Sequence, residues 1–170
     1  MKDSASLILA ALVVLSLILG GCCSSTVTTI VLVRHAERLN NTDTTPLSLP
    51  GFQRAGALRH ALDSAGIQTI FVTEKLRTQQ TAESLRVAHS LPLVQIPLTE
   101  TQRLVDSLRS RSGQKLLVVG HSDTVPQIIE AFGFSPPPAI GGTEFDKMFI
   151  LTLRKNANRL LQLQYGAKSP

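Results

Sequence analysis

Cysteine is scarce in this sequence: only two of the 170 residues are Cys, and they are adjacent, at Cys22 and Cys23. So few cysteines exclude a scaffold held together by disulfides and a zinc site built from thiolates. A Gly-X-Y or heptad period is also missing, which excludes collagen and coiled coil. Hydrophobic residues make up 43% of the chain and charged residues 17%, a composition that excludes a disordered chain.

Aromatic side chains are few as well, since the chain has six Phe, one Tyr and no Trp. None of them interleaves with basic residues in the way that stacking on single-stranded nucleic acid requires. Lys and Arg number 17 and Asp and Glu 12, which gives a formal net charge of +5. This excess favours anionic ligands of several kinds. We therefore expect no nucleic-acid partner, and the sequence gives no indication of oligomeric state.

The first 25 residues differ from the rest of the chain. Lys2 and Asp3 precede an uncharged apolar run from Leu7 to Leu19, and Gly20, Gly21 and Cys22 follow it. A membrane-spanning helix needs about 20 apolar residues, whereas about 7–15 suit the core of a signal peptide. The segment that ends at Cys22 resembles the lipobox of bacterial lipoproteins, in which the Cys is lipidated and becomes the new N-terminus.

We therefore expect residues 1–21 to be a lipoprotein signal peptide, residues 22–28 a tether and residues 29–170 one domain. An uncleaved N-terminal anchor is the alternative. Both place the domain outside the cytoplasm, attached to a membrane of the cell envelope. In a Gram-negative cell this is the periplasmic side.

Strand and helix patterns alternate along the remaining sequence. Apolar, β-branched runs predict strands at 29–33, 68–72, 93–96, 115–119, 145–153 and 160–164. Apolar residues at helical spacing predict helices at 51–65, 78–89, 99–110 and 124–132. In the first helix the predicted apolar face consists of Phe52, Ala55, Leu58 and Leu62. The alternation predicts a three-layer α/β/α sandwich with a mostly parallel central sheet.

Three of the predicted strands run into basic residues, which are Arg34 and His35, then Arg77, then His121. In open α/β sheets, ligands bind at the carboxyl ends of the strands, so these four side chains converge if the strands are neighbours. Arg presents a planar fork that matches phosphate oxygens, and imidazole is a competent nucleophile near neutral pH. Nearby cations also disfavour protonation of the imidazole. The residues predict phosphoryl transfer through a phosphohistidine, with no metal or other cofactor required.

The same residues lie in four segments that resemble the motifs of the histidine phosphatase superfamily, the phosphoglycerate-mutase-like proteins. They are Val33-Arg34-His35-Ala36-Glu37, Leu47-Ser48-x-x-Gly51, Leu76-Arg77-Thr78-Gln79-Gln80-Thr81-Ala82-Glu83 and Val118-Val119-Gly120-His121-Ser122. All four occur in the family's order between Ile30 and Phe132. The resemblance implies a phosphoglycerate-mutase-like fold and phosphatase activity on a small phosphorylated substrate.

The resemblance also implies roles for individual residues. His35 is the phosphorylated nucleophile, with its second ring nitrogen held by a backbone carbonyl. Arg34, Arg77 and His121 line the phosphate pocket, and Asn41 falls where many members carry a phosphate-contacting Asn. The candidates for the general acid are, in order, Glu100, Glu37 and Asp123.

Three functions remain open on the sequence. Hydrolysis of phosphate monoesters is favoured over mutase activity, because the chain has little insertion material for a lid. The alternatives are a protein phosphohistidine phosphatase and a non-catalytic, anion-binding lipoprotein. The general acid distinguishes them, because an ester's leaving alkoxide needs a proton that a phosphoramidate nitrogen can already carry.

Overall fold

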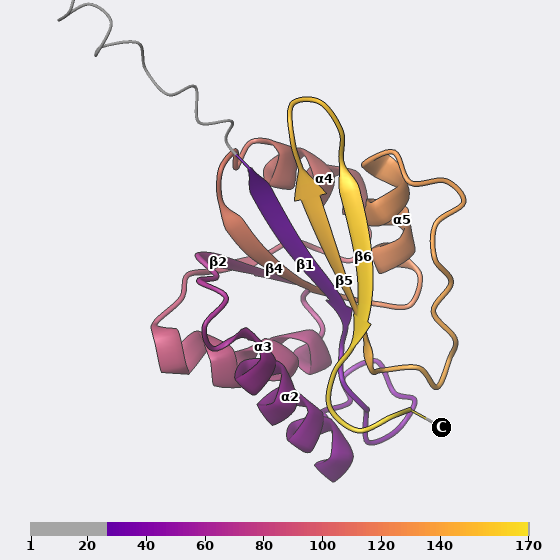
Figure 1. Cartoon of the computed structure of the whole chain (residues 1–170). Coiled ribbons are helices and arrows are strands. Elements are labelled where there is room, and N and C mark those ends of the chain that lie inside the picture. The colour runs from indigo at the N-terminus through magenta and orange to yellow at the C-terminus, as the bar shows by residue number, and fades with distance from the viewer. Residues whose placement is uncertain (1–26, 170) are drawn as a thin grey trace, which may run out of the picture.

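The computed structural model describes residues 27–169, which form a six-stranded sheet flanked by four helices (Figure 1). The strands are β1 (Thr28–Arg34), β2 (Thr69–Val72), β3 (Leu93–Gln95), β4 (Lys115–Gly120), β5 (Lys147–Leu153) and β6 (Arg159–Gln164). Their order in the sheet is β3-β2-β4-β1-β5-β6. The pairs from β3 to β1 are parallel, and only β5 runs against the other strands. The expected mostly parallel sheet is thus confirmed.

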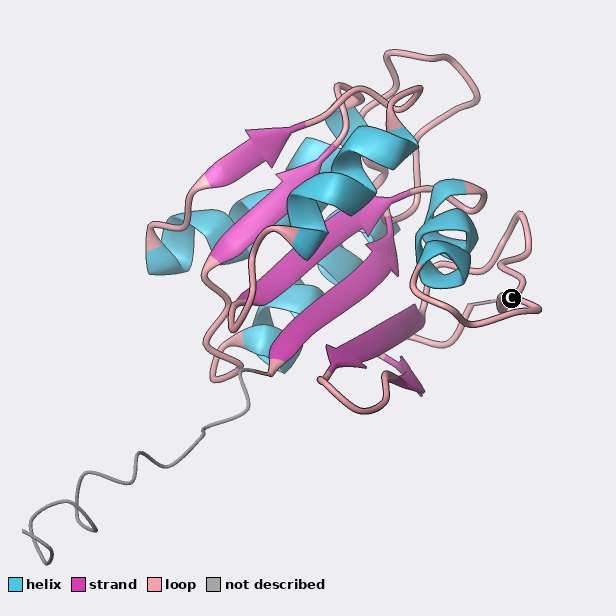
Figure 2. Ribbon diagram, turned by 90° about the horizontal axis from the view of Figure 1, so that it is seen from above, coloured by secondary structure: helices cyan, strands magenta, loops and turns pink. Residues whose placement is uncertain are grey.

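The helices form a layer on each face of the sheet (Figure 2). They are α2 (Leu49–Leu62), α3 (Leu76–His89), α4 (Thr101–Arg109) and α5 (Thr124–Ala131). Helices α2 and α3 share one core with the sheet, and α4 and α5 share the other. This is the predicted three-layer α/β/α sandwich.

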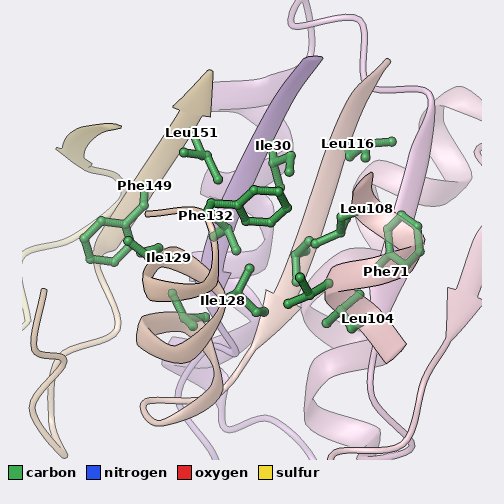
Figure 3. Packing of buried hydrophobic residues seen from close by; sticks show 14 of the residues in the cluster. Ile30, Phe71, Leu104, Leu108, Leu116, Ile128, Ile129, Phe132, Phe149 and Leu151 are labelled. Atoms are coloured by element: carbon green, nitrogen blue, oxygen red, sulfur yellow. The ribbon is translucent and has the colours of Figure 1, made fainter. Parts of the chain in front are cut away.

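Alternation along the central strands supplies both cores. In β1, Ile30 and Leu32 face α4 and α5, while Val31 and Val33 face α2 and α3. Figure 3 shows the first of these cores, in which Ile30, Phe71 and Leu116 of three strands meet Leu108 and Ile128 of the helices. Because β1 and β4 are buried on both faces, their sequences are almost continuously apolar, as is typical of central parallel strands.

Helix α2 departs from its prediction in two ways. It ends at Leu62 instead of residue 65, and Phe52 is half exposed instead of buried. The buried face is formed by Gly51, Arg54, Ala55 and Leu58 together with Leu62. Helical spacing allows either Phe52 or Arg54 on this face. Arg54 is the buried one because it binds Glu37, which lies outside the helix.

The domain boundaries remain a prediction, because residues 1–21, Cys22 and most of the tether lie outside the described residues. Between residues 27 and 169, no helix combines the length and apolar character needed to cross a bilayer.

Candidate active site

The register of β1 and β4 determines where the two predicted histidines lie. Arg34 is paired with Gly120 at the carboxyl ends of these parallel strands, so the next residues, His35 and His121, are neighbours. The His35 backbone N–H donates to the Gly120 carbonyl at 2.9 Å, and the two ring centroids are 5.2 Å apart. Both side chains are buried, with 3% and 6% of their surface exposed.

His35 is held in one tautomer by the backbone. Its Nδ1 lies 2.8 Å from the Ala36 carbonyl oxygen, which can only accept a hydrogen bond. Nδ1 therefore carries the proton of the neutral ring, and Nε2 carries the free lone pair. Burial, followed by the charges of His121, Arg34 and Arg77, lowers the pKa of His35 to about 3 against the opposing Ala36 hydrogen bond. The ring is thus an uncharged nucleophile at neutral pH.

His121 is fixed by Thr73, the residue directly after β2, and by the first turn of α5. Its Nε2 lies 3.0 Å from Thr73 Oγ1, and its backbone N–H donates to Thr124 Oγ1 at 2.9 Å. Burial and the neighbouring Arg77 lower the pKa of His121 to about 4. An incoming phosphoryl dianion would favour the protonated ring, which is then a hydrogen-bond donor.

Arg34 is immobilised by a loop that follows α5. Its Nη1 donates to the carbonyl oxygens of Gly141, Gly142 and Glu144 at 2.8, 2.9 and 3.1 Å. The guanidinium carbon lies 4.1 Å from the centroid of the Phe145 ring, which also flanks His35 at 6.0 Å. Segment 141–145 therefore forms one wall of the site.

Arg77, in the first turn of α3, completes the basic set. Its Nη1 donates to the Asp43 carbonyl at 3.1 Å. Among the described residues, three buried polar side-chain atoms lack a hydrogen-bond partner, and two of them are the Nε atoms of Arg34 and Arg77. An unsatisfied buried donor costs about 1–3 kcal/mol. A bound anion would supply the missing acceptors, so this arrangement favours an oxyanion ligand.

Arg38 was not among the predicted site residues. It is exposed, three residues after His35, and its charge contributes, after burial, to lowering the pKa of both Arg34 and Arg77. A third cation therefore lies within electrostatic reach of the pocket. Its position shortly after the nucleophile was the available signal.

The two leading acid candidates have other partners. The Glu37 carboxylate is bound by Arg54, with Oε1 2.6 Å from Nη2 and 2.9 Å from Nε. Glu100 pairs with Arg103 at 2.7 Å at the start of α4. Both carboxylates therefore accept hydrogen bonds from an arginine side chain that is not one of the predicted site residues.

Asp123 is the remaining predicted acid. Its Oδ1 accepts from the Thr124 N–H at 2.8 Å, directly after His121, and its charge acts on both His121 and Arg34. It is exposed at the same edge of the sheet. Asn41 is also exposed, but none of the site's hydrogen bonds involves it; the neighbouring Asp43 contributes the contact to Arg77 instead.

Glu74 is a further carboxylate near the site that was not predicted. Its Oε2 accepts from the Leu98 N–H at 2.8 Å, and its Oε1 lies 3.2 Å from Lys75 Nζ. Although burial alone would raise it, these contacts lower the pKa of Glu74. The carboxylate therefore stays ionised.

Two of the sequence motifs hold the loop that carries the nucleophile. Thr81 Oγ1 accepts from the Ala36 N–H at 2.9 Å. The Glu37 carbonyl accepts from the Ser48 N–H at 2.9 Å and from its hydroxyl at 3.2 Å. Gly51 packs so closely against this carbonyl that a Cβ atom would overlap it. Ser48, Gly51 and Thr81 thus position His35 from α2 and α3.

Within residues 27–169, no three His, Cys, Asp or Glu side chains gather in a way that could hold a metal ion.

Residues 30–105 match the family model of the histidine phosphatase superfamily, branch 1. This histidine phosphatase match contains Arg34, His35 and Arg77, and His121 lies beyond it. Among curated proteins, none matches the sequence significantly.

Several solved structures share the fold. The protein histidine phosphatase SixA, complexed with tungstate, is similar with a TM-score of 0.67 and 19% identity over 80% of this chain and 96% of that chain. The alpha-ribazole phosphatase from Shigella flexneri is similar with a TM-score of 0.64 and 17% sequence identity, over 80% of this chain and 96% of that chain. YhfR from Bacillus stearothermophilus is similar with a TM-score of 0.64 and 18% sequence identity, over 78% of this chain and 95% of that chain.

Proposed function

We propose that this protein is a phosphatase that transfers a phosphoryl group to Nε2 of His35 and then to water. The observation that carries the proposal is the buried, neutral His35, anchored through Nδ1 beside two arginines whose buried Nε atoms have no partner. The family match, and the SixA structure complexed with the oxyanion tungstate, support it.

In the first step, Arg34 and Arg77 bind the phosphoryl oxygens, and His35 Nε2 attacks phosphorus. The Nε2–P bond forms as the bond from phosphorus to the leaving group breaks, and the leaving oxygen takes a proton that Asp123 supplies. Water then attacks phosphorus and loses a proton to Asp123, and phosphate departs as the Nε2–P bond breaks. His121 donates to an equatorial oxygen, where negative charge is concentrated in the transition state.

The leaving group has space beside Arg77. A surface pocket of about 410 Å³ is lined by Asp43, Thr44, Glu74, Lys75 and Leu76. Lys75 joins its two carboxylates, with Nζ 2.7 Å from Asp43 Oδ2 and 3.2 Å from Glu74 Oε1. A small leaving group with hydrogen-bonding groups would meet the charged side chains of Asp43, Glu74 and Lys75 in this pocket.

The test uses the chain from Ser24 onward, which retains every strand, helix and core cluster described above. Wild type is expected to hydrolyse an aryl phosphate and to yield an acid-labile phosphoryl group on the quenched protein. His35→Ala should do neither while keeping its circular dichroism spectrum. Retained turnover in His35→Ala would exclude the phosphohistidine route, and phosphate binding without turnover in wild type would favour the anion-binding lipoprotein.

Hydrolysis of a protein phosphohistidine is the second candidate, and one observation favours it. Glu37 and Glu100 are both paired with arginines, so Asp123 alone among the predicted acids remains to protonate an ester's leaving group. A phosphoramidate nitrogen can arrive already protonated. The ratio of kcat/KM for a phosphohistidine peptide and an aryl phosphate, measured on the same preparation, decides between the two substrates.

We also propose that Cys22 carries a lipid and holds the domain on a cell-envelope membrane outside the cytoplasm, on the periplasmic side in a Gram-negative cell. The apolar run from Leu7 to Leu19 and the residues up to Cys22 support this attachment. Mass spectrometry of the mature protein should find an acylated N-terminal Cys22. A Cys22→Ala variant should keep its leader.

A further inference from the structure

The positive charge of this protein is concentrated at its C-terminal end. Residues 147–170 contain five Lys or Arg residues and no Asp or Glu, whereas residues 1–146 contain 12 of each kind. The entire formal net charge of +5 therefore belongs to a segment that begins with β5. The positions of these five residues in the fold show where the positive charge gathers.

Three of the five basic residues lie on the hairpin between β5 and β6. Arg154, Lys155 and Arg159 are exposed, and no acidic side chain of residues 27–169 forms an ion pair with any of them. Together with Asn156 and Ala157 they line a surface hollow of about 270 Å³. The hairpin thus carries three positive charges that no acidic side chain of the described residues pairs with, and these residues surround a hollow that is open to solvent.

This basic hairpin lies at the end of the sheet where β1 begins. Thr28, the first residue of β1, pairs with Leu153, the residue just before the hairpin. Figure 1 shows the start of β1 beside the β5–β6 hairpin. The candidate active site lies at the other end of β1, about 20 Å away at roughly 3.3 Å per strand residue.

Apolar surface continues from the hairpin along the edge strand β6. Leu161 and Leu163 are 54% and 41% exposed. Leu163 also lines an apolar pocket of about 340 Å³ with Val31, Ile67 and Met148. Leu163 lies opposite Met148, toward the carboxyl end of β1, whereas Leu161 follows Arg159 by two residues. Basic residues beside an exposed leucine form a combination that binds at a lipid–water interface, where cations meet headgroups and apolar groups enter the acyl boundary.

We propose that the basic hairpin, Arg154 to Arg159, docks on an anionic lipid surface. Its charge is complementary to acidic headgroups. The N-terminal chain also enters at the same end of the sheet, so Cys22, the proposed lipid attachment site, lies at most about 20 Å from Thr28 along a fully extended chain. Docking at the end of the sheet where β1 begins turns the carboxyl ends of β1 and β4 away from the membrane, toward diffusing substrate. The inference rests on charge and topology, independently of the catalytic proposal.

The test measures binding of the chain from Ser24 onward to sedimented vesicles of phosphatidylcholine with or without phosphatidylglycerol. We expect binding to the anionic vesicles only, weakening as salt screens the charges. The variant Arg154→Gln/Lys155→Gln/Arg159→Gln should lower the partition coefficient by about two orders of magnitude, since each basic residue near such a surface contributes about 1 kcal/mol.

A matched variant, Arg59→Gln/Arg86→Gln/Arg103→Gln, removes the same charge from the helices and should retain binding. Equal losses in the two variants would overturn the proposal, because binding would then follow net charge alone. Absence of binding to anionic vesicles, or displacement from them by a short oligonucleotide at low concentration, would also overturn it. Turnover of an aryl phosphate should be the same in both variants, so a failure of lipid docking is separable from a failure of the catalytic proposal.

Discussion

At the scale of single residues, the state of His35 decides whether the site can act as a nucleophile. Its pKa is lowered to about 3 by burial and by the neighbouring cations, so the ring should remain neutral as pH falls from 7 to 5. We expect the imidazole NMR signals of His35, assigned with His35→Ala, to remain unchanged over that interval. A midpoint near 6.5 would contradict the burial and hydrogen bonding described here.

A second prediction at the level of single residues concerns Asp123. If it protonates the leaving oxygen, Asp123→Asn should lower kcat for an aryl phosphate with a poor leaving group by about 100-fold or more. Turnover of a phosphohistidine peptide should change little, because its leaving nitrogen needs no proton from the protein. Since Asn can still cap α5, circular dichroism should be unchanged. Equal losses on both substrates would assign Asp123 a role in phosphate binding instead.

At the scale of elements, α2 acts as a support for the nucleophile loop through Gly51. In Gly51→Ala the new Cβ would overlap the Glu37 carbonyl and displace the loop, which should lower kcat by about 100-fold. Gly56→Ala in the same helix is the matched control, because its Cβ meets nothing within 4 Å. It should raise stability by up to about 1 kcal/mol without affecting kcat. Similar activities for the two variants would remove Gly51 from this role.

Helix α2 is also tied to the C-terminal segment through the buried Arg54. Nη1 donates to the carbonyls of Tyr165 and Ala167 at 3.0 and 2.9 Å, while Nε and Nη2 bind Glu37. Arg54→Met leaves the Glu37 charge and both carbonyls without this donor, so the free energy of unfolding in urea should fall by about 3 kcal/mol. The exposed Arg59→Met in the same helix should change it by less than about 0.5 kcal/mol.

These contacts show how far the sequence could predict the fold and the candidate site. Strands and helices were recognisable from local apolar patterns, and the two His and two Arg from their positions after apolar strands. Contacts between distant segments leave no such local pattern. Arg54 meets Tyr165 across 111 residues and Arg34 meets Gly141 across 107. For this reason the helical spacing predicts Phe52 instead of Arg54 on the buried face of α2, and the sequence makes Glu37 a candidate acid although Arg54 binds it.

At the scale of the whole molecule, the two buried histidines make stability depend on pH. Their pKa values, about 3 for His35 and about 4 for His121, lie below the unfolded value near 6.5, so in this interval the unfolded chain binds more protons. The free energy of unfolding should therefore rise with pH from about 4 to 6.5 and level off above, with each ring contributing up to about 1.4 kcal/mol per pH unit. Urea titrations across this range should show a shallower slope in His35→Gln/His121→Gln than in wild type. A slope unchanged by the double substitution would mean that carboxylates, not the two rings, carry the acid sensitivity.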